Sequence, residues 1–175
     1  MNNSERDRSV LSMAAAERAH KRATGDSGLG DIAIYIHMRA CNVMMQERLG
    51  RLLQPHGLVP LGYITMMALY SRPENLANPS ELSDVTGETR GNMTRICDEL
   101  VDKGFVRRVP NAEDRRRVDL SLTDAGMALL NTVAPQLRQN ATAFYQRNFT
   151  KAEKATLQQL LAQFSSALAN DATDL

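Results

Sequence analysis

The sequence predicts a mainly α-helical fold with one small β-hairpin, and three observations support this fold class. Apolar residues recur at helical spacing through most of the 175 residues. The stretch 105–123 contains two short apolar segments around a basic, turn-prone tip, and the second segment alternates apolar and polar residues as a half-buried strand does. Directly before this stretch, two helical segments meet at Gly87, which favours a tight turn.

The N-terminal part predicts an arm followed by a long helix. Residues 1–28 are expected to form the arm, in which the Ala-rich segment 9–24 can make one helix before several glycines end it. Asp31 stands where an N-cap is expected, for a helix that runs to about Gln54 and ends at Pro55. Apolar residues occur on several faces of this helix, so we expect it to pack on more than one side.

A further helix is predicted over 60–71, because proline is favoured in the first turn of a helix and Pro60 begins this apolar segment. The residues that follow, 72–78, are mostly polar and include Pro73. A loop is therefore expected there.

Two helices of unequal length come next. The short one covers 79–86, with Asn78 as its expected cap, and Gly87 makes the turn. The longer one covers 88–103 and is stopped by Gly104. This pair has the size and turn of a helix-turn-helix, whose second helix enters the major groove of DNA with its N-terminal end.

The longer helix has two unlike faces. Its apolar stripe is expected to face the core and consists of Met93, Ile96, Cys97, Leu100 and Val101. Its first turns carry hydrogen-bonding side chains suited to phosphates and base edges, namely Thr89, Arg90, Asn92, Thr94 and Arg95, together with Gly91. Arginine pairs with guanine and asparagine with adenine, each discriminating by about 1–3 kcal/mol. Taken alone, this helix fits equally well as an amphipathic helix with a solvated face.

The hairpin carries the strongest local charge. Its five arginines are Arg107, Arg108, Arg115, Arg116 and Arg117. Between residues 90 and 117 there are eight Lys and Arg against five Asp and Glu, although the net charge of the chain is only +1. A thin arginine-rich hairpin can lie along a phosphate backbone and place a guanidinium in a minor groove. Its position after the helix-turn-helix predicts a winged helix-turn-helix DNA-binding domain over 59–123.

Two long helices are predicted after the hairpin. Thr123 is expected to cap a helix that runs to about Asn148, with a kink or joint at Pro135. Thr150 and Glu153 have the spacing of a capping box and open the last helix. That helix presents an apolar stripe formed by Leu157, Leu160, Leu161, Phe164 and Leu168.

Composition excludes other classes of protein. The two cysteines supply no disulfide framework, no apolar run is long enough to span a membrane, and the first residues lack the order of a signal peptide, so a cytoplasmic location is expected. The histidines at 20, 37 and 56 lack metal-ligand spacing, and no nucleophile elbow or phosphate-binding glycine loop is present. We therefore predict no enzyme, catalytic residue, cofactor or metal. A pure protein-interaction module would not need the arginines of the hairpin.

Several motifs resemble the MarR family over roughly residues 60–130, and in particular its multidrug-efflux repressors of the EmrR type. They are Pro-Ser-Glu-Leu at 79–82, Arg-Gly-Asn-Met-Thr-Arg-Ile-Cys-Asp-Glu-Leu at 90–100, Lys-Gly-Phe-Val at 103–106, Asp-Arg-Arg at 114–116 and Leu-Thr-Asp-Ala-Gly at 122–126. The resemblance implies a homodimer that binds a pseudo-palindromic operator in double-stranded DNA, usually as a repressor. It also implies that Asp114 orients Arg116 toward the minor groove, with Arg115 serving phosphates.

The resemblance further implies dimerisation through the first and last helices, here 29–58 and 124–175, which suits the apolar stripe of the last helix. It implies release from DNA by a small aromatic or phenolic effector. The residues available for that site are His37, Arg39, Tyr63, Met66, Met67 and Tyr70, and the alternative for the methionines and tyrosines is the core. Redox sensing through cysteine and transcriptional activation remain open, although both Cys41 and Cys97 are expected to be buried.

Overall fold

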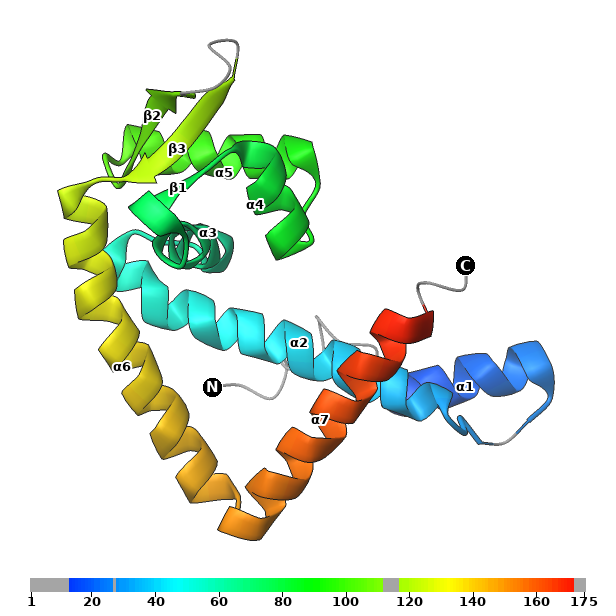
Figure 1. The fold of residues 1–175 in the computed structure, drawn as a ribbon. Helices are drawn as coiled ribbons and strands as arrows, with labels where there is room; N and C mark the ends of the chain where they lie inside the picture. The colour runs from blue at the N-terminus through cyan, green and yellow to red at the C-terminus, as the bar shows by residue number, and fades with distance from the viewer. Residues whose placement is uncertain (1–12, 27, 112–116, 172–175) are drawn as a thin grey trace. The chain divides into compact units, whose positions relative to one another are not determined.

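The computed structural model describes residues 13–26, 28–111 and 117–171. Seven α-helices and three strands lie in these residues, and Figure 1 shows their order along the chain. The chain divides into two compact units, Met1–Met127 and Ala128–Leu175. The first contains the predicted helix-turn-helix and its hairpin, and each unit is described separately below.

The first unit begins with α1 (Met13–Thr24) and α2 (Ile32–Leu53). Asp31 occupies the N-cap position of α2 as predicted, but its φ of −68° and ψ of −20° are helical and its side chain makes no cap hydrogen bond. Only Leu53 of α2 is buried, so the expectation that this helix packs on several sides is not met within the chain. A short 3-10 helix, η1 (Gln54–His56), follows and contains Pro55.

The segment after α3 (Pro60–Tyr70) differs from the prediction. Within the expected loop 72–78, a 3-10 turn, η2 (Pro73–Asn75), leads into a strand, β1 (Leu76–Ala77). This strand pairs antiparallel with β3, with Leu76 opposite Ser121. Two residues are too short for an alternating pattern to show, and the pairing partner lies far along the chain.

The helix-turn-helix forms as predicted. Asn78 caps α4 (Pro79–Thr86) through a full capping box, because its Oδ1 accepts the backbone N–H of Glu81 at 3.0 Å and its own N–H donates to the Glu81 carboxylate at 3.2 Å. Gly87 follows with a left-handed φ of 70°. The second helix, α5 (Arg90–Asp102), starts two residues later than predicted because Thr89 is extended and acts as its N-cap.

The hairpin is formed by β2 (Val106–Pro110) and β3 (Val118–Leu122), and with β1 it makes a three-stranded antiparallel sheet in the order β1-β3-β2. The register pairs Val106 with Leu122 and Pro110 with Val118. Pro110 is the last residue of β2, as expected for a residue that cannot donate to the ladder.

The core of this unit lies between α3, α4, α5 and the sheet. Its most deeply buried side chains are Met66, Leu69, Leu82, Met93, Ile96, Leu100, Val106 and Leu120. All but Val101 of the apolar stripe predicted for α5 is buried, and Val101 is half-buried. Burying one such large side chain contributes about 1.5–3 kcal/mol, so this small core holds α5 firmly against its neighbours.

The base of the hairpin is tied to the start of α6 (Asp124–Asn148). The Thr123 hydroxyl donates to the Gly104 carbonyl at 2.7 Å and accepts the Gly126 N–H at 3.1 Å, and the Thr123 N–H donates to the Phe105 carbonyl at 3.0 Å. A Cβ atom on Gly126 would lie 2.1 Å from the Phe105 carbonyl oxygen. The first turn of α6 therefore requires glycine, which explains the Leu-Thr-Asp-Ala-Gly motif in local terms.

The second unit contains most of α6, which continues through Pro135, and α7 (Lys151–Asp171). The predicted capping box is present: the Thr150 N–H donates to the Glu153 carboxylate at 2.7 Å, and the Glu153 N–H donates to the Thr150 hydroxyl at 3.2 Å. The bonds from Thr150 hold the pKa of Glu153 below its ordinary value. Every apolar side chain of the predicted α7 stripe is exposed.

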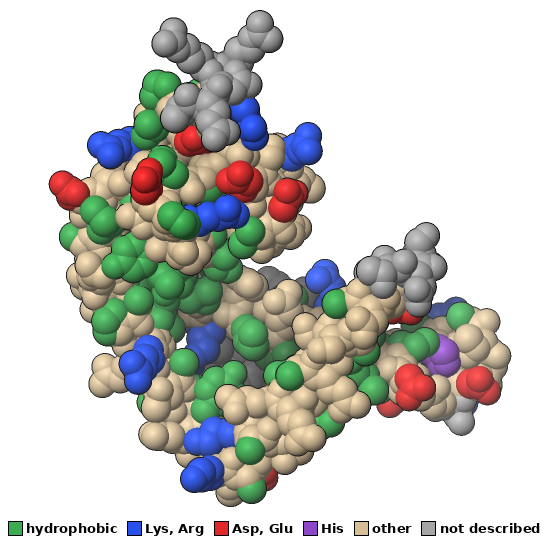
Figure 2. Space-filling view, in the orientation of Figure 1, with side chains coloured by type: hydrophobic (Ala, Val, Ile, Leu, Met, Phe, Trp, Pro, Cys, Tyr) green, Lys and Arg blue, Asp and Glu red, His purple; other side chains and the backbone are tan. Residues whose placement is uncertain are grey.

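Apolar side chains stand at the surface of both units in the space-filling view of Figure 2. None of the helices in the described residues has the length and hydropathy needed to cross a membrane.

Candidate nucleic-acid interface

The structure brings five of the predicted DNA-contacting residues together on the first turns of α5. Thr89, Arg90, Thr94 and Arg95 are exposed, and Asn92 is half-buried. No acidic residue lies in the first turn of this helix, and its N–H groups and macrodipole favour a negative ligand at that end. The side chains and the backbone of this helix end therefore both suit a phosphate-rich partner.

Two of the threonines have local roles as well. The Thr89 hydroxyl accepts the Asn92 backbone N–H at 3.3 Å and so caps the helix. The Thr94 hydroxyl donates to the Arg90 carbonyl at 2.9 Å. Since a hydroxyl has one hydrogen and two lone pairs, Thr89 keeps its donor and Thr94 keeps its acceptors for an external partner.

Hydrogen bonds link the polar side chains along this helix. The Asn92 Nδ2 group donates to the Glu88 carboxylate at 2.8 Å, and an Arg95 terminal nitrogen donates to Asn92 Oδ1 at 3.0 Å. Arg95 also lies 3.6 Å from the Glu99 carboxylate, yet 65% of its side chain is exposed. Arg95 is thus held at the surface by neighbours on its own helix.

Gly91 has no atom within 4 Å of the position of a Cβ. It is exposed and lies in the first turn of α5, beside Arg90 and Asn92. The absent side chain leaves room for a nucleic-acid backbone to approach the helix closely.

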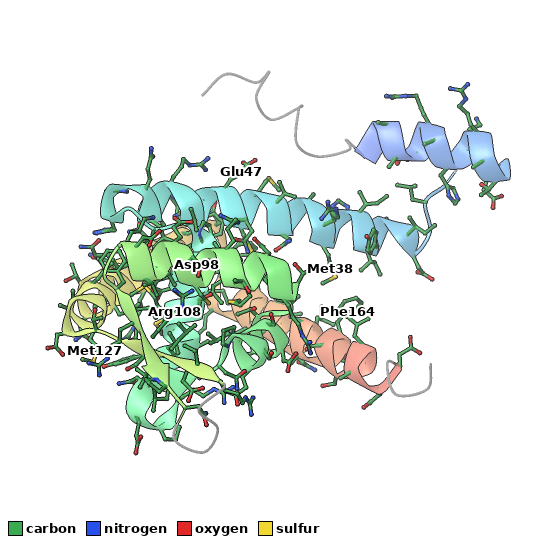
Figure 3. The ribbon with its side chains drawn as sticks, turned by 90° about the horizontal axis from the view of Figure 1, so that it is seen from above. Met38, Glu47, Asp98, Arg108, Met127 and Phe164 are labelled. Atoms are coloured by element: carbon green, nitrogen blue, oxygen red, sulfur yellow. The ribbon has the colours of Figure 1, made fainter. Side chains whose placement is uncertain are left out.

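An ion pair joins the recognition helix to the hairpin. Asp98 on α5 and Arg108 on β2, both labelled in Figure 3, form a salt bridge. At the far end of the strands, the Asn111 amide donates to the Asp119 carboxylate at 2.7 Å. The described part of the hairpin is therefore tied to α5 at the middle of β2, where Arg108 makes the ion pair, and is cross-linked near its tip by Asn111 and Asp119.

Arg107 and Arg117, the other described arginines of the hairpin, are exposed. The predicted residues Asp114, Arg115 and Arg116 lie outside the described residues, so their expected roles at the minor groove and at phosphates stay predictions.

Not every basic residue counted in the sequence is available to a ligand. Lys103 donates to the Glu99 carboxylate at 2.6 Å and to the Gly57 carbonyl at 2.7 Å. Arg108 is likewise paired, with Asp98. The count of Lys and Arg between residues 90 and 117 is therefore larger than the number of basic side chains available to a ligand. On the face drawn in Figure 2, acidic and basic side chains alternate over this region instead of forming one block.

The residues predicted for an effector site lie on two helices and differ in burial. His37 and Arg39 on α2 are exposed. On α3, Met66 is fully buried in the core, Tyr63 is half-buried, and Met67 and Tyr70 are exposed. Burial raises the pKa of Tyr63 above its ordinary value. Its hydroxyl can donate a hydrogen bond, as any tyrosine hydroxyl does at neutral pH.

A surface hollow of about 420 Å³ lies where α2 ends and α3 begins, and it includes none of the six predicted effector residues. Arg51, Leu58 and Pro60 are among the residues that line it. Among the described residues, no group of three His, Cys, Asp or Glu side chains could hold a metal ion.

The two cysteines differ. Cys97 is buried as expected, and burial together with the charge of Asp98 raises the pKa of its thiol to about 11. The expectation that Cys41 is buried is wrong, because this residue is exposed. It lies on α2, where Leu53 is the one residue of the helix that is buried.

Sequence reasoning missed the side chains that support the interface, above all Glu88, Asp98 and Glu99. The spacing of Glu88 and Asn92, four residues apart, and of Asn92 and Arg95, three apart, was a usable signal, since such residues are neighbours on a helix surface. The pairing of Asp98 with Arg108 had no comparable signal, because it joins two different elements.

The chain is similar to regulators from Escherichia coli. The model of the MarR family matches residues 56–117. The HTH-type transcriptional regulator PrsX is 34% identical over 96 residues, which cover 53% of this chain but only 58% of that relative. The transcriptional repressor MprA of strain K12 is 30% identical over 133 residues, covering 76% of this chain and 73% of the relative.

A solved structure agrees with these sequences. The crystal structure of a mutant MarR from Escherichia coli complexed with operator DNA matches with a TM-score of 0.66 at 28% identity. The match covers 83% of this chain and 96% of that one. The fold of this chain is therefore similar to that of a protein whose crystal structure contains operator DNA.

Proposed function

The chain belongs to the MarR family, and from this premise we propose that it is a DNA-binding transcriptional regulator that acts as a homodimeric repressor. The observation that carries the proposal is the first half of α5. There, exposed donor side chains and a helix N-terminus stand together, and a compact core and a braced hairpin hold them in place. The matching MarR structure, which contains operator DNA, supports the same use of these elements.

The proposed contacts divide between the two grooves. Arg90, Asn92 and Arg95 enter the major groove, where they meet base edges and the neighbouring phosphates. The hairpin follows the backbone with Arg107 and Arg117, and Arg116, oriented by Asp114, enters the minor groove. Arg115 serves a phosphate.

Exposed apolar side chains support the dimer. On α2 they are Ile32, Ile34, Tyr35, Met44 and Met45, and on α7 they are Leu157, Leu160, Leu161, Phe164 and Leu168. A stable protein seldom leaves two helices this apolar in water. A second copy that covers 29–58 and 124–175 removes these side chains from water. It also presents two copies of α5 to half-sites about one DNA turn apart.

We further propose that a small aromatic or phenolic effector releases the dimer from its operator. Tyr63, Met67 and Tyr70 offer a phenol donor, an adaptable thioether and an exposed ring along α3, and His37 or Arg39 offers a cation for a carboxylate. Met66, the sixth predicted residue, is fully buried and acts by packing behind this face.

The direct test is a footprint of the full chain on the DNA upstream of its own coding sequence, with and without a panel of phenolic ligands. The proposal expects protection of a pseudo-palindrome, lost on addition of at least one ligand of the panel. Protection that no phenol relieves but peroxide does, with Cys41→Ser insensitive, favours the redox alternative, for which the exposed Cys41 thiol is the supporting observation. Increased transcription from the bound promoter favours an activator.

A further inference from the structure

We propose that Glu88 is a positioning residue for base recognition: its carboxylate fixes the side-chain amide of Asn92 so that Asn92 reads adenine. This inference rests on the proposed function. It concerns an acidic side chain at the end of α5 that is expected to face DNA, where a carboxylate is otherwise unfavourable because phosphates repel it.

The backbone of Glu88 is fixed by the turn between α4 and α5. Its N–H donates to the Ser83 carbonyl at 3.1 Å, and the side chain is half-buried. From this position the carboxylate accepts the Asn92 Nδ2 group at 2.8 Å. Glu88 forms no salt bridge with the described residues. Its carboxylate instead accepts the hydrogen bond from Asn92.

The two neighbours of Asn92 determine which way its amide points. An ionised carboxylate only accepts hydrogen bonds, so the amide atom that meets Glu88 must be the nitrogen. A guanidinium only donates, so the atom 3.0 Å from the Arg95 nitrogen must be the oxygen. If the amide were reversed, the Asn92 nitrogen would face the Arg95 guanidinium, donor against donor. The Asn92 oxygen would face the Glu88 carboxylate, acceptor against acceptor. The orientation therefore follows from chemistry alone.

This arrangement leaves Asn92 with one N–H and one oxygen lone pair, because an amide has two of each and one of each is used. Adenine presents in the major groove the matching pair, the N7 acceptor and an N6 donor. Guanine presents two acceptors at the same edge and does not match. When Arg95 turns toward DNA, only Glu88 still holds the Asn92 amide. Glu88 therefore contributes most to the orientation of Asn92 when the protein is bound to DNA.

A competing explanation is that Glu88 itself reads a cytosine, whose N4 group donates to carboxylates. In that case removing Glu88 changes the preference at a different base pair from the one that Asn92 reads. The positioning role predicts a change at the same base pair as truncation of Asn92, and no further change when both residues are altered.

The experiment selects bound sequences from a DNA duplex library with a randomised centre and measures base preference by sequencing. The proteins are the wild type, Glu88→Ala, Asn92→Ala, the double variant and Glu88→Gln, with Asp102→Ala as the matched control. Asp102 is also an acid on α5, but it is exposed at the other end of the helix from Asn92. Thermal unfolding of each variant checks that it is folded.

We expect the wild type to select adenine at one position in each half-site, and Asn92→Ala to lose about 5-fold to 150-fold of that preference. Glu88→Ala is expected to lose a smaller part at the same position. The double variant should match Asn92→Ala, because residues that act as one unit are not additive. Glu88→Gln keeps an acceptor and should retain most of the preference, and Asp102→Ala should keep it fully.

Separate outcomes contradict the inference and the function on which it rests. Three results overturn the positioning role of Glu88 while leaving the proposed regulator intact. They are additive losses of adenine preference in the double variant, a changed preference at another base pair, and an equal loss of preference in Glu88→Gln and Glu88→Ala. A folded wild type that enriches no sequence from the library overturns the proposed function itself.

Discussion

Gly126→Ala tests how the hairpin is joined to the rest of the molecule. A Cβ at this position would lie 2.1 Å from the Phe105 carbonyl oxygen and 3.0 Å from its carbon, and both are backbone atoms that no rotamer change can move aside. The chain must shift the 104–105 turn away from α6. The same carbonyl accepts the Thr123 N–H at 3.0 Å, and the neighbouring Gly104 carbonyl accepts the Thr123 hydroxyl at 2.7 Å, so the shift weakens both hydrogen bonds.

The expected cost follows from these contacts. Overpacking of a rigid site costs about 1–3 kcal/mol, and each weakened hydrogen bond up to about 0.5–1.5 kcal/mol. Together the free energy of unfolding should fall by about 2–6 kcal/mol. For a chain of this size, that lowers Tm by about 4–24 °C.

The assay is thermal and urea unfolding followed by circular dichroism, at matched protein concentration because a dimer makes Tm depend on concentration. The matched control is Gly91→Ala, which also places a Cβ in the first turn of a helix but has no atom within 4 Å. The control should gain up to about 1 kcal/mol from helix propensity. Equal Tm values for Gly126→Ala and the wild type would refute the reasoning about this contact.

The remaining predictions concern binding, capping and thiol chemistry. Arg95→Ala should weaken operator binding and lower the ratio of specific to random binding, whereas equal losses on both DNAs would make Arg95 a phosphate contact. Arg116→Ala should weaken operator binding strongly while gel filtration still shows the dimer, and unchanged binding would overturn the wing assignment. Asn78→Ala should lower the free energy of unfolding by about 1 kcal/mol, since it removes the cap of α4. At neutral pH, and at protein concentrations low enough to dissociate the proposed dimer that covers α2, a thiol reagent should label Cys41 and spare the buried Cys97, whose pKa is raised to about 11. Equal labelling rates would show that α5 opens readily.

Local chemistry accounts for the parts of the fold that the sequence predicts well. Asn78, Gly87 and the pair Thr150 and Glu153 each act within a few residues, so their capping and turn signals are visible in the sequence and are present in the structure. The periodicity of α5 likewise identifies its buried face, because one helix contributes the whole stripe.

The features that the sequence does not reveal depend on distant partners. Strand β1 exists because β3 offers it a ladder, and its two residues carry no pattern of their own. Asp31 has the right type for a cap, yet its helical backbone angles prevent the bond. The exposure of Cys41 depends on what covers α2, which no local pattern encodes.

The sequence predicts which residues form the interface, but it does not predict which of their side chains bond to one another. Spacing places Glu88, Asn92 and Arg95 on one side of α5, whereas the choice among their possible partners depends on side-chain rotamers. The same holds for the hairpin, where five arginines look alike in the sequence and Arg108 proves to be committed to Asp98.

The central claim is that this chain recognises a specific DNA sequence through α5 and the hairpin. Its most direct test is the affinity of the full chain for a duplex selected from the randomised library and for a scrambled duplex of the same composition, each measured over a range of salt concentrations. We expect the selected duplex to bind at least about 10³-fold more tightly, and both affinities to fall steeply with salt as phosphate counterions are released. Equal affinity for the two duplexes, or binding that does not change with salt, would contradict the claim.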